Sequence, residues 1–170
     1  MICELVTQAR VGLDPERGLD HGCWSVLRSM YGGADIPVVQ LSLDTSQPAS
    51  FHYGLAKDLA PLRGQDVLIV GSGNIVHNLA LLDFHRPGGF DWADRFNEEL
   101  KRRILAGEHD ELVAYDALGS DARLAMPTPE HYLPLLYVLA LQADSDSVSL
   151  FNDQTVMGSI SMTSVMLGRQ

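Results

Sequence analysis

Short apolar runs and a helically spaced apolar segment follow one another in the first half of the chain. Residues 37–43 and 66–70 are rich in aliphatic and β-branched residues, which is typical of buried strands. Between them, Phe51, Leu55 and Leu59 recur at helical spacing. A strand, a helix and a second strand in this order predict one βαβ unit with parallel strands.

The second half of the chain predicts two longer helices and two more strands. Helices are expected near residues 92–106 and 128–142, and the latter can begin with Thr128 as its cap and Pro129 in its first position. Shorter helices are expected at 4–10, 23–31 and 110–117, and strands at 147–151 and 158–167. We therefore expect an α/β fold with a mostly parallel central sheet flanked by helices, in one domain covering residues 1–170.

Composition narrows the classes of partner. The chain has 170 residues, 46% of them hydrophobic and 20% charged, which suits a domain with a proper core. Its formal net charge of -10 argues against nucleic acid as a partner. The longest apolar run, residues 132–143, is interrupted by Pro134 and is too short to span a membrane.

The cysteines and the N-terminus favour a cytoplasmic location. Cys3 and Cys23 match no zinc or redox spacing, and no basic segment followed by an apolar stretch opens the chain. We therefore expect a protein of the reducing cytoplasm.

Three histidines stand at loops or element ends, where chemistry is more common than on an apolar face. His77 follows the predicted strand 66–70, and the carboxyl ends of parallel strands are where α/β sheets place ligands. His131 is expected in the first turn of its helix, where the helix dipole favours the neutral imidazole that binds metals. His21 lies beside Asp20, which can raise imidazole basicity. Together these histidines hint at a metal site.

Other readings of the same residues are weaker. The glycines of residues 71–78 lack the spacing of a dinucleotide fingerprint and are followed by no phosphate-binding lysine. Ser72 lacks the surrounding pattern of a hydrolase nucleophile. His52, His85 and His109 have no arranged partner in the sequence, and we interpret them as structural or surface residues.

Five motifs occur in an order that resembles one known family. They are residues 20–24 (DHGCW), 36–42 (IPVVQLS), 71–78 (GSGNIVHN), 127–135 (PTPEHYLPL) and 158–162 (GSISM). This order resembles the class III extradiol ring-cleavage dioxygenases, in the branch that includes the DOPA 4,5-dioxygenases. The resemblance extends from about Glu4 to Gly168, and it implies the α/β fold of the extradiol dioxygenase B subunit.

The resemblance also implies an activity and a set of roles. In that family a non-haem Fe(II), with Zn(II) as a substitute in some relatives, binds a catechol-type substrate such as DOPA together with dioxygen, and the ring opens beside the diol. By motif, His131 resembles a metal ligand, and His77 resembles a ligand or base at the metal. His21 resembles a substrate-facing acid or base.

The chain departs from the family pattern in one respect. The family's N-terminal half carries a His-Gly-Ser-Pro and a Ser-Ala-His-Trp motif, each with a metal histidine, and this sequence contains neither. We therefore expect an N-terminally truncated version of the fold that forms a homodimer or a complex with a missing half. The alternative to an active dioxygenase is a catalytically incomplete remnant or subunit that serves in assembly.

Overall fold

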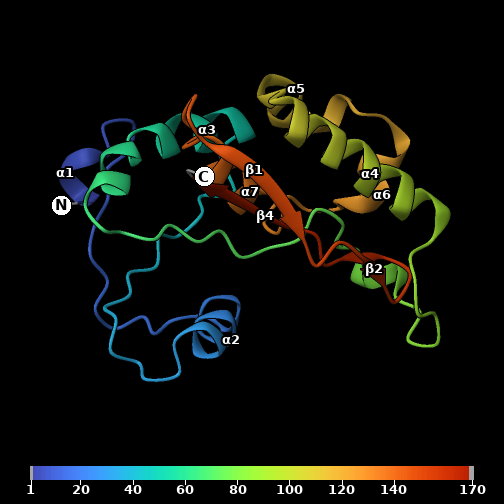
Figure 1. The fold of residues 1–170 in the computed structure, drawn as a ribbon, viewed down its shortest axis with the longest axis horizontal. Helices are drawn as coiled ribbons and strands as arrows, with labels where there is room; N and C mark the ends of the chain where they lie inside the picture. The colour runs from blue at the N-terminus through green and yellow to red at the C-terminus, as the bar shows by residue number, and fades with distance from the viewer. Residues whose placement is uncertain (1, 169–170) are drawn as a thin grey trace.

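The computed structural model describes residues 2–168, and within them helices predominate (Figure 1). The α-helices are α1 (Ile2–Leu5), α2 (His21–Met30), α3 (Ala49–Lys57), α4 (Asp91–Ala106), α5 (His109–Val113), α6 (Ser120–Ala125) and α7 (Leu133–Leu139). Short 3-10 turns are η1 (Ala60–Gly64), η2 (Leu79–Leu81) and η3 (Tyr115–Ala117). The strands are β1 (Ser147–Phe151), β2 (Thr155–Val156), β3 (Ile160–Ser161) and β4 (Ser164–Gly168).

Helix α4 is the longest element of the described chain, and its sequence explains which of its faces is buried and where the helix ends. Phe96, Leu100 and Ile104 are spaced by four residues and are at most 2% exposed, so one face of the helix enters the core. The helix ends at Gly107, whose φ of 70° is the left-handed conformation that glycine adopts without a steric cost. The prediction of a helix at 92–106 is confirmed.

Helix α7 lies between two apolar clusters. Leu133, Leu136 and Leu139 belong to the larger cluster, which also contains the buried face of α4. Tyr137 and Leu141 belong to a smaller cluster with the buried residues of α3 and η1. Since α7 contributes buried residues to both clusters, it is the core element that the two helical groups share.

The sheets differ from the prediction. β1 pairs antiparallel with β4, from Ser147 opposite Gly168 to Phe151 opposite Ser164, and β2 pairs antiparallel with β3. Among the described residues no parallel sheet forms, so the predicted mostly parallel central sheet is wrong for this structure. Residues 37–43 and 67–70 belong to no helix or strand there, and Asp66 lies in a turn with a positive φ of 56°. The predicted strands at 37–43 and 66–70 are therefore wrong for this structure, because a strand also requires a neighbour to pair with.

Two other predicted boundaries also need correction. Helix α7 begins at Leu133 and not at Thr128, because Pro134 lacks an N–H and suits only the first turn of a helix. His131 therefore precedes the helix, and the argument from its dipole does not apply. The expected strand 158–167 is divided into β3 and β4, because the chain changes partner from β2 to β1.

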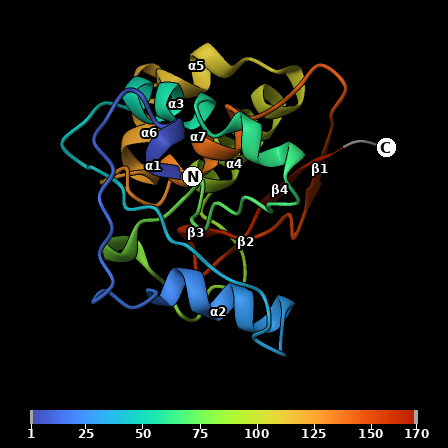
Figure 2. The ribbon, with the colours of Figure 1, turned by 90° about the vertical axis from the view of Figure 1, so that its left-hand side faces the viewer.

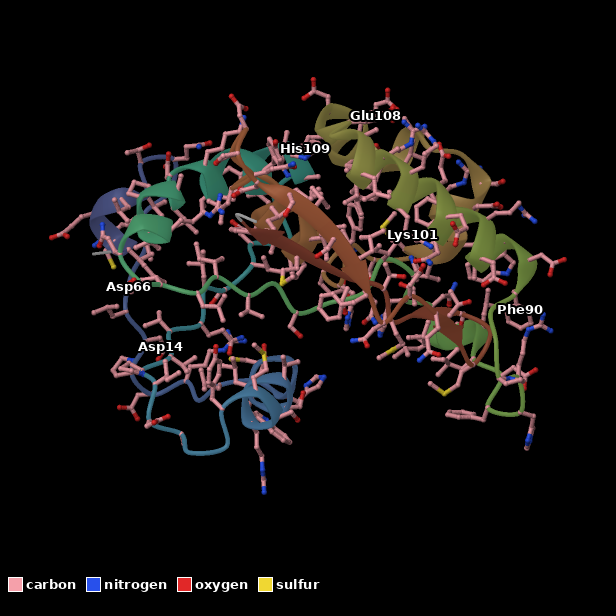
Figure 3. The ribbon with its side chains drawn as sticks, viewed as in Figure 1. Asp14, Asp66, Phe90, Lys101, Glu108 and His109 are labelled. Atoms are coloured by element: carbon pink, nitrogen blue, oxygen red, sulfur yellow. The ribbon has the colours of Figure 1, made fainter. Side chains whose placement is uncertain are left out.

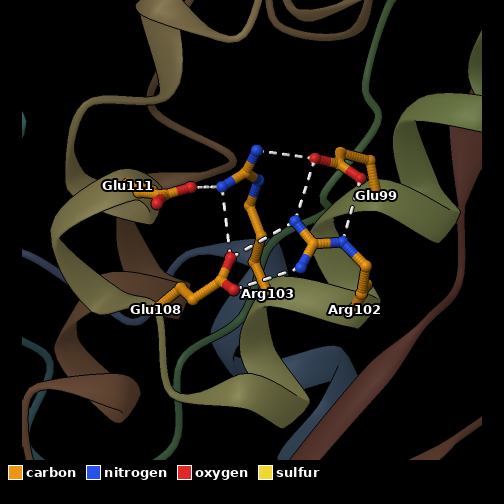
Figure 4. A network of polar contacts seen from close by, with 5 residues as sticks. All are labelled: Glu99, Arg102, Arg103, Glu108 and Glu111. Atoms are coloured by element: carbon orange, nitrogen blue, oxygen red, sulfur yellow. Dashed lines mark hydrogen bonds and ion pairs between the residues drawn. The ribbon is translucent and has the colours of Figure 1, made fainter.

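A group of charged side chains joins the end of α4 to α5 (Figures 3 and 4). The Arg103 guanidinium lies 2.6 Å from Glu99 and 3.2 Å from Glu108, and it also contacts Glu111. Arg102 lies 3.1 Å from Glu108. These opposite charges offset one another within the cluster, and we interpret the cluster as structural.

Among the described helices, none is long and apolar enough to cross a membrane.

Candidate metal and substrate site

The loop that carries His77 is held by hydrogen bonds on both sides. The His77 backbone N–H donates to the carbonyl oxygen of Ala125 at 2.8 Å, and the Asn78 N–H donates to that of Ser159 at 3.1 Å. The Asn74 side chain donates to the Ser161 carbonyl at 2.6 Å. The loop is thus fixed between α6 and β3, and the His77 ring is presented from a rigid backbone.

Two glycines let this loop approach the segment that carries His131. An ideal Cβ at Gly73 would lie 2.0 Å from the carbonyl oxygen of His131, and one at Gly71 would lie 2.4 Å from that of Pro134. The Asn74 N–H donates to the same His131 carbonyl at 2.8 Å. A side chain at either glycine would force the two segments apart. The close packing of the two backbone segments therefore accounts for both glycines, and no bound nucleotide is needed to explain them.

The close approach places two of the predicted histidines face to face. The ring centroids of His77 and His131 are 3.5 Å apart, and the ring planes differ by 16°. Imidazole lone pairs lie in the ring plane, so stacked rings direct them roughly parallel to one another. One ion held by both rings would therefore require the rings to tilt apart.

Both stacked histidines favour the neutral form. Burial lowers the pKa of His77 below its ordinary 6.5, and the neighbouring His131 lowers it further. Burial also lowers the pKa of His131, while the Glu130 carboxylate opposes this shift and His21 adds to it. Neutral imidazole is the form that binds a metal ion, so both rings are ready for one at neutral pH. Glu130 was not among the predicted site residues. Its position next to His131 in the sequence is the one signal that could have indicated it.

His21 enters the site from a different element. It is the first residue of α2, and the preceding Asp20 caps this helix by accepting the Cys23 N–H at 2.9 Å. The Gln40 amide donates to the Asp20 carboxylate at 2.5 Å, and the Asp20 N–H donates back to Gln40 at 3.0 Å. The Asp20 carboxylate therefore fixes the start of the helix, and this positions His21.

Helix α2 also lies against the loop that carries His77. An ideal Cβ at Gly22 would lie 3.5 Å from the Ser72 hydroxyl oxygen, which is ordinary contact distance. His21 itself is exposed to solvent, and its charge reaches His131. The three predicted histidines thus gather in one region.

The remaining histidines lie elsewhere. His52 is fully buried, with its ring nitrogens 3.0 Å from the Tyr137 hydroxyl and 3.1 Å from the Asp44 carbonyl. His109 Nδ1 lies 2.8 Å from the Tyr53 hydroxyl, and His85 is on the surface. Their surroundings agree with the structural or surface interpretation.

His77 and His131 are side chains of a type that binds metal ions, but two such ligands are too few for a complete metal site. Two neutral imidazoles suit iron or zinc. However, among residues 2–168 no group of three or more histidine, cysteine, aspartate or glutamate side chains is arranged to hold an ion. A groove of about 170 Å³ next to His131 is lined by Gly73, Leu135, Phe151 and Thr163, among others. Sites for small molecules usually enclose roughly 300–1,000 Å³, so this groove is smaller than a typical ligand site.

The chain is similar to several known proteins in sequence and in fold. Residues 1–168 match the family described as the catalytic LigB subunit of aromatic ring-opening dioxygenase. The chain is 43% identical over 173 residues to a 4,5-DOPA dioxygenase extradiol of Escherichia coli strain K12, and 36% identical over 143 residues to a protein of that name from Beta vulgaris. It superimposes with a TM-score of 0.89, at 42% identity, on the crystal structure of uncharacterized protein JW3007 from E. coli K12.

The chain belongs to the LigB family of aromatic ring-opening dioxygenase subunits. Its relatives place it in the branch similar to the 4,5-DOPA extradiol dioxygenases. The match covers 98% of this chain but 63% of the E. coli relative, and 84% of this chain but 53% of the Beta vulgaris relative. Of the crystallised E. coli chain, 69% is covered. The chain thus spans less than two thirds of the length of the two 4,5-DOPA dioxygenases.

Proposed function

We propose that this chain contributes to the extradiol opening of catechol-type substrates, of which DOPA is the family-level example. The observation that carries the proposal is the His77–His131 pair, because both rings lie in motifs that resemble the family's and both favour the neutral form. The names of the relatives support the same reaction class.

The metal would be held in part by His131 and His77. The family resemblance implies a non-haem Fe(II), with Zn(II) as an alternative. When bound, such an ion supplies charge stabilisation for the catecholate and orients the diol and dioxygen. The remaining ligands would come from outside the described residues, since no third donor is arranged there.

The protein's own contribution to the chemistry is proton transfer and positioning. A catechol must lose protons as it chelates a metal, and a neutral imidazole is a suitable acceptor. His77 is proposed as that base or as a ligand, because burial keeps its pKa low and its backbone is fixed. His21, exposed at the start of α2, is proposed to face the substrate as an acid or base.

A second candidate is a catalytically incomplete subunit that serves in assembly. Two observations favour it, namely the two-histidine donor set and the small groove beside it. Under this candidate the stacked histidines are an inherited feature of the fold and turn over no substrate, even when the rest of the fold is supplied.

Turnover of DOPA separates the two candidates. The chain would be assayed anaerobically loaded with Fe(II), then mixed with oxygen and DOPA, alone and together with the portion of the E. coli relative that this chain does not match. We expect no measurable yellow semialdehyde from the chain alone, and product when the second polypeptide is present. His77→Ala should abolish this product, whereas His85→Ala, at an exposed loop residue, should leave it unchanged. Absence of product in the combined sample would favour the assembly role.

A further inference from the structure

Residues 158–162, one of the motifs of the sequence, pair with the loop that carries His77. His77 lies opposite Ile160 in an isolated antiparallel bridge. In the view of Figure 2, β3, which contains Ile160, lies between the helices at the top and α2 at the bottom. The residues on either side of His77 therefore meet the serines on either side of Ile160. We refer to residues 158–162 as the serine segment.

Each of the two flanking pairs is joined by one backbone bond and one serine hydroxyl. The Asn78 N–H donates to the Ser159 carbonyl at 3.1 Å, and the Ser159 hydroxyl donates to the Asn78 carbonyl at 2.7 Å. The Ser161 N–H donates to the Val76 carbonyl at 3.0 Å, and the Val76 N–H donates to the Ser161 hydroxyl at 3.0 Å. In a regular antiparallel ladder the second bond of each pair would also join two backbone groups. The two hydroxyls take the place of these two ladder bonds.

Both serines occupy positions where an apolar side chain is the ordinary choice. They are 0% exposed, as is the neighbouring Val76. Among the described residues, the Ser161 hydroxyl is the one acceptor of the Val76 N–H, and a buried N–H without a partner is strongly unfavourable. The Asn78 carbonyl, in contrast, also accepts the Leu81 N–H at 3.2 Å. Loss of the Ser161 hydroxyl should therefore disturb the loop more than loss of the Ser159 hydroxyl.

The serine segment is itself anchored beside the start of α4. The Gly158 N–H donates to the Gly88 carbonyl at 2.9 Å, and the Phe90 N–H donates to the Gly158 carbonyl at 2.7 Å. Gly158 has a φ of 79°, and an ideal Cβ there would lie 2.4 Å from the Phe90 ring, so this contact requires glycine. A segment fixed at this end can fix the loop that pairs with it.

The position of the loop decides how the His77 ring meets the His131 ring. Their centroids are 3.5 Å apart, and functional groups in a site must be held to within about 0.5 Å. The His77 N–H donates to Ala125 and not to β3. The bonds to the serine segment on either side of His77 are therefore what relates its ring to β3.

We propose that the Ser159 and Ser161 hydroxyls are positioning groups for His77. They hold the backbone on both sides of this residue and thereby set the stacking of its ring on that of His131. Neither serine is assigned a contact with substrate. The consequence for catalysis rests on the proposed function, whereas the positioning itself does not.

Proton NMR of the full chain tests the positioning without metal or turnover. Ring protons that lie over the face of a neighbouring aromatic ring resonate upfield, so the stacked rings of His77 and His131 should show upfield shifts, assigned with His77→Ala and His131→Ala. We expect Ser161→Ala to remove most of the upfield shift of His77. Ser159→Ala should remove a smaller part, because the Asn78 carbonyl keeps its bond from Leu81.

A matched control separates positioning from a general loss of stability. Tyr137→Phe removes another buried hydroxyl, 3.0 Å from His52, and should lower stability without moving the His77 resonances. Circular dichroism shows which variants fold, and Ser159→Ala decides alone if Ser161→Ala does not. Unchanged His77 shifts in the folded serine variants would overturn the proposal. A loss of the same size in Tyr137→Phe would also overturn it, because the effect would then follow stability and not the serine contacts.

Zinc calorimetry adds a readout that links the positioning to the candidate site. Ser161→Ala should weaken zinc binding about tenfold or more, as is typical when a group that orients a metal ligand is lost. Failure of the parent chain to bind zinc would count against the proposed function, whereas the NMR comparison would still support or overturn the positioning.

Discussion

The helical body and residues 36–43 and 66–70, together called the open strand face, contain the same kinds of apolar side chain in opposite environments. In the body, Leu100 and Leu136 are fully buried between α4, α6 and α7. On the open strand face, Leu68 and Val39 remain 60% and 73% exposed although their sequence surroundings are equally apolar. The body completes its own core, whereas the face does not. The contrast shows that apolar side chains alone do not decide burial, which also depends on whether neighbouring elements pack against them.

The largest expected effect is on the free energy of unfolding. Leu100→Ala removes a fully buried side chain and leaves a cavity, so it should cost about 2–5 kcal/mol. Leu68→Ala, on the open strand face, should cost less than about 0.5 kcal/mol in the isolated chain. Urea unfolding followed by circular dichroism measures both. Equal costs at low protein concentration would mean that Leu68 is packed in solution and that the comparison between the two regions is wrong.

The pH dependence of stability offers a second, smaller test of the helical body. Burial lowers the pKa of His52 and of His109 below the ordinary 6.5. Between that value and the lower folded pKa, the unfolded chain binds more protons than the folded chain. Stability should therefore decrease as pH falls below 6.5, by at most about 1.4 kcal/mol per pH unit for each histidine.

A substitution at His52 isolates its share of this decrease. His52→Gln should cost stability at pH 8, because two buried contacts change. Its decline from pH 7 to pH 5.5 should nevertheless be shallower than that of the parent chain, since one titrating group is absent. Urea unfolding of both proteins at pH 8, 7 and 5.5 gives the comparison. A decline of the same slope in both proteins would show that His52 is not a source of the pH dependence.

The helices were largely predictable because their signals are local. The helix expected near 92–106 corresponds to α4, and the positions of Gly107 and the buried face explain its end and orientation. The prediction of a parallel sheet was wrong, because strand pairing depends on a neighbouring segment. The apolar pattern within residues 37–43 and 66–70 does not encode that neighbour. The start of α7 was misplaced because Pro129 was given the role that Pro134 takes.

The candidate site was predictable in its residues but not in its geometry. His77 and His131 were identified from their motifs, yet their stacking depends on the close backbone approach at Gly73, which no spacing rule reveals. Asp20 was expected to act on the His21 ring, whereas its carboxylate caps α2 and binds Gln40. The catalytic role of His21 stays a prediction, as do the cytoplasmic location and the oligomeric state.

Titration of Zn(II) into the purified chain, followed by calorimetry, tests most directly the central claim that this chain holds only part of a metal site. Zinc avoids oxidation and binds the same neutral imidazoles. We expect weak binding, with a dissociation constant above roughly 1 µM, that His77→Ala and His131→Ala abolish and His85→Ala leaves intact. Tight one-to-one binding by the parent chain would contradict the account, because residues 1–170 would then contain a complete ligand set.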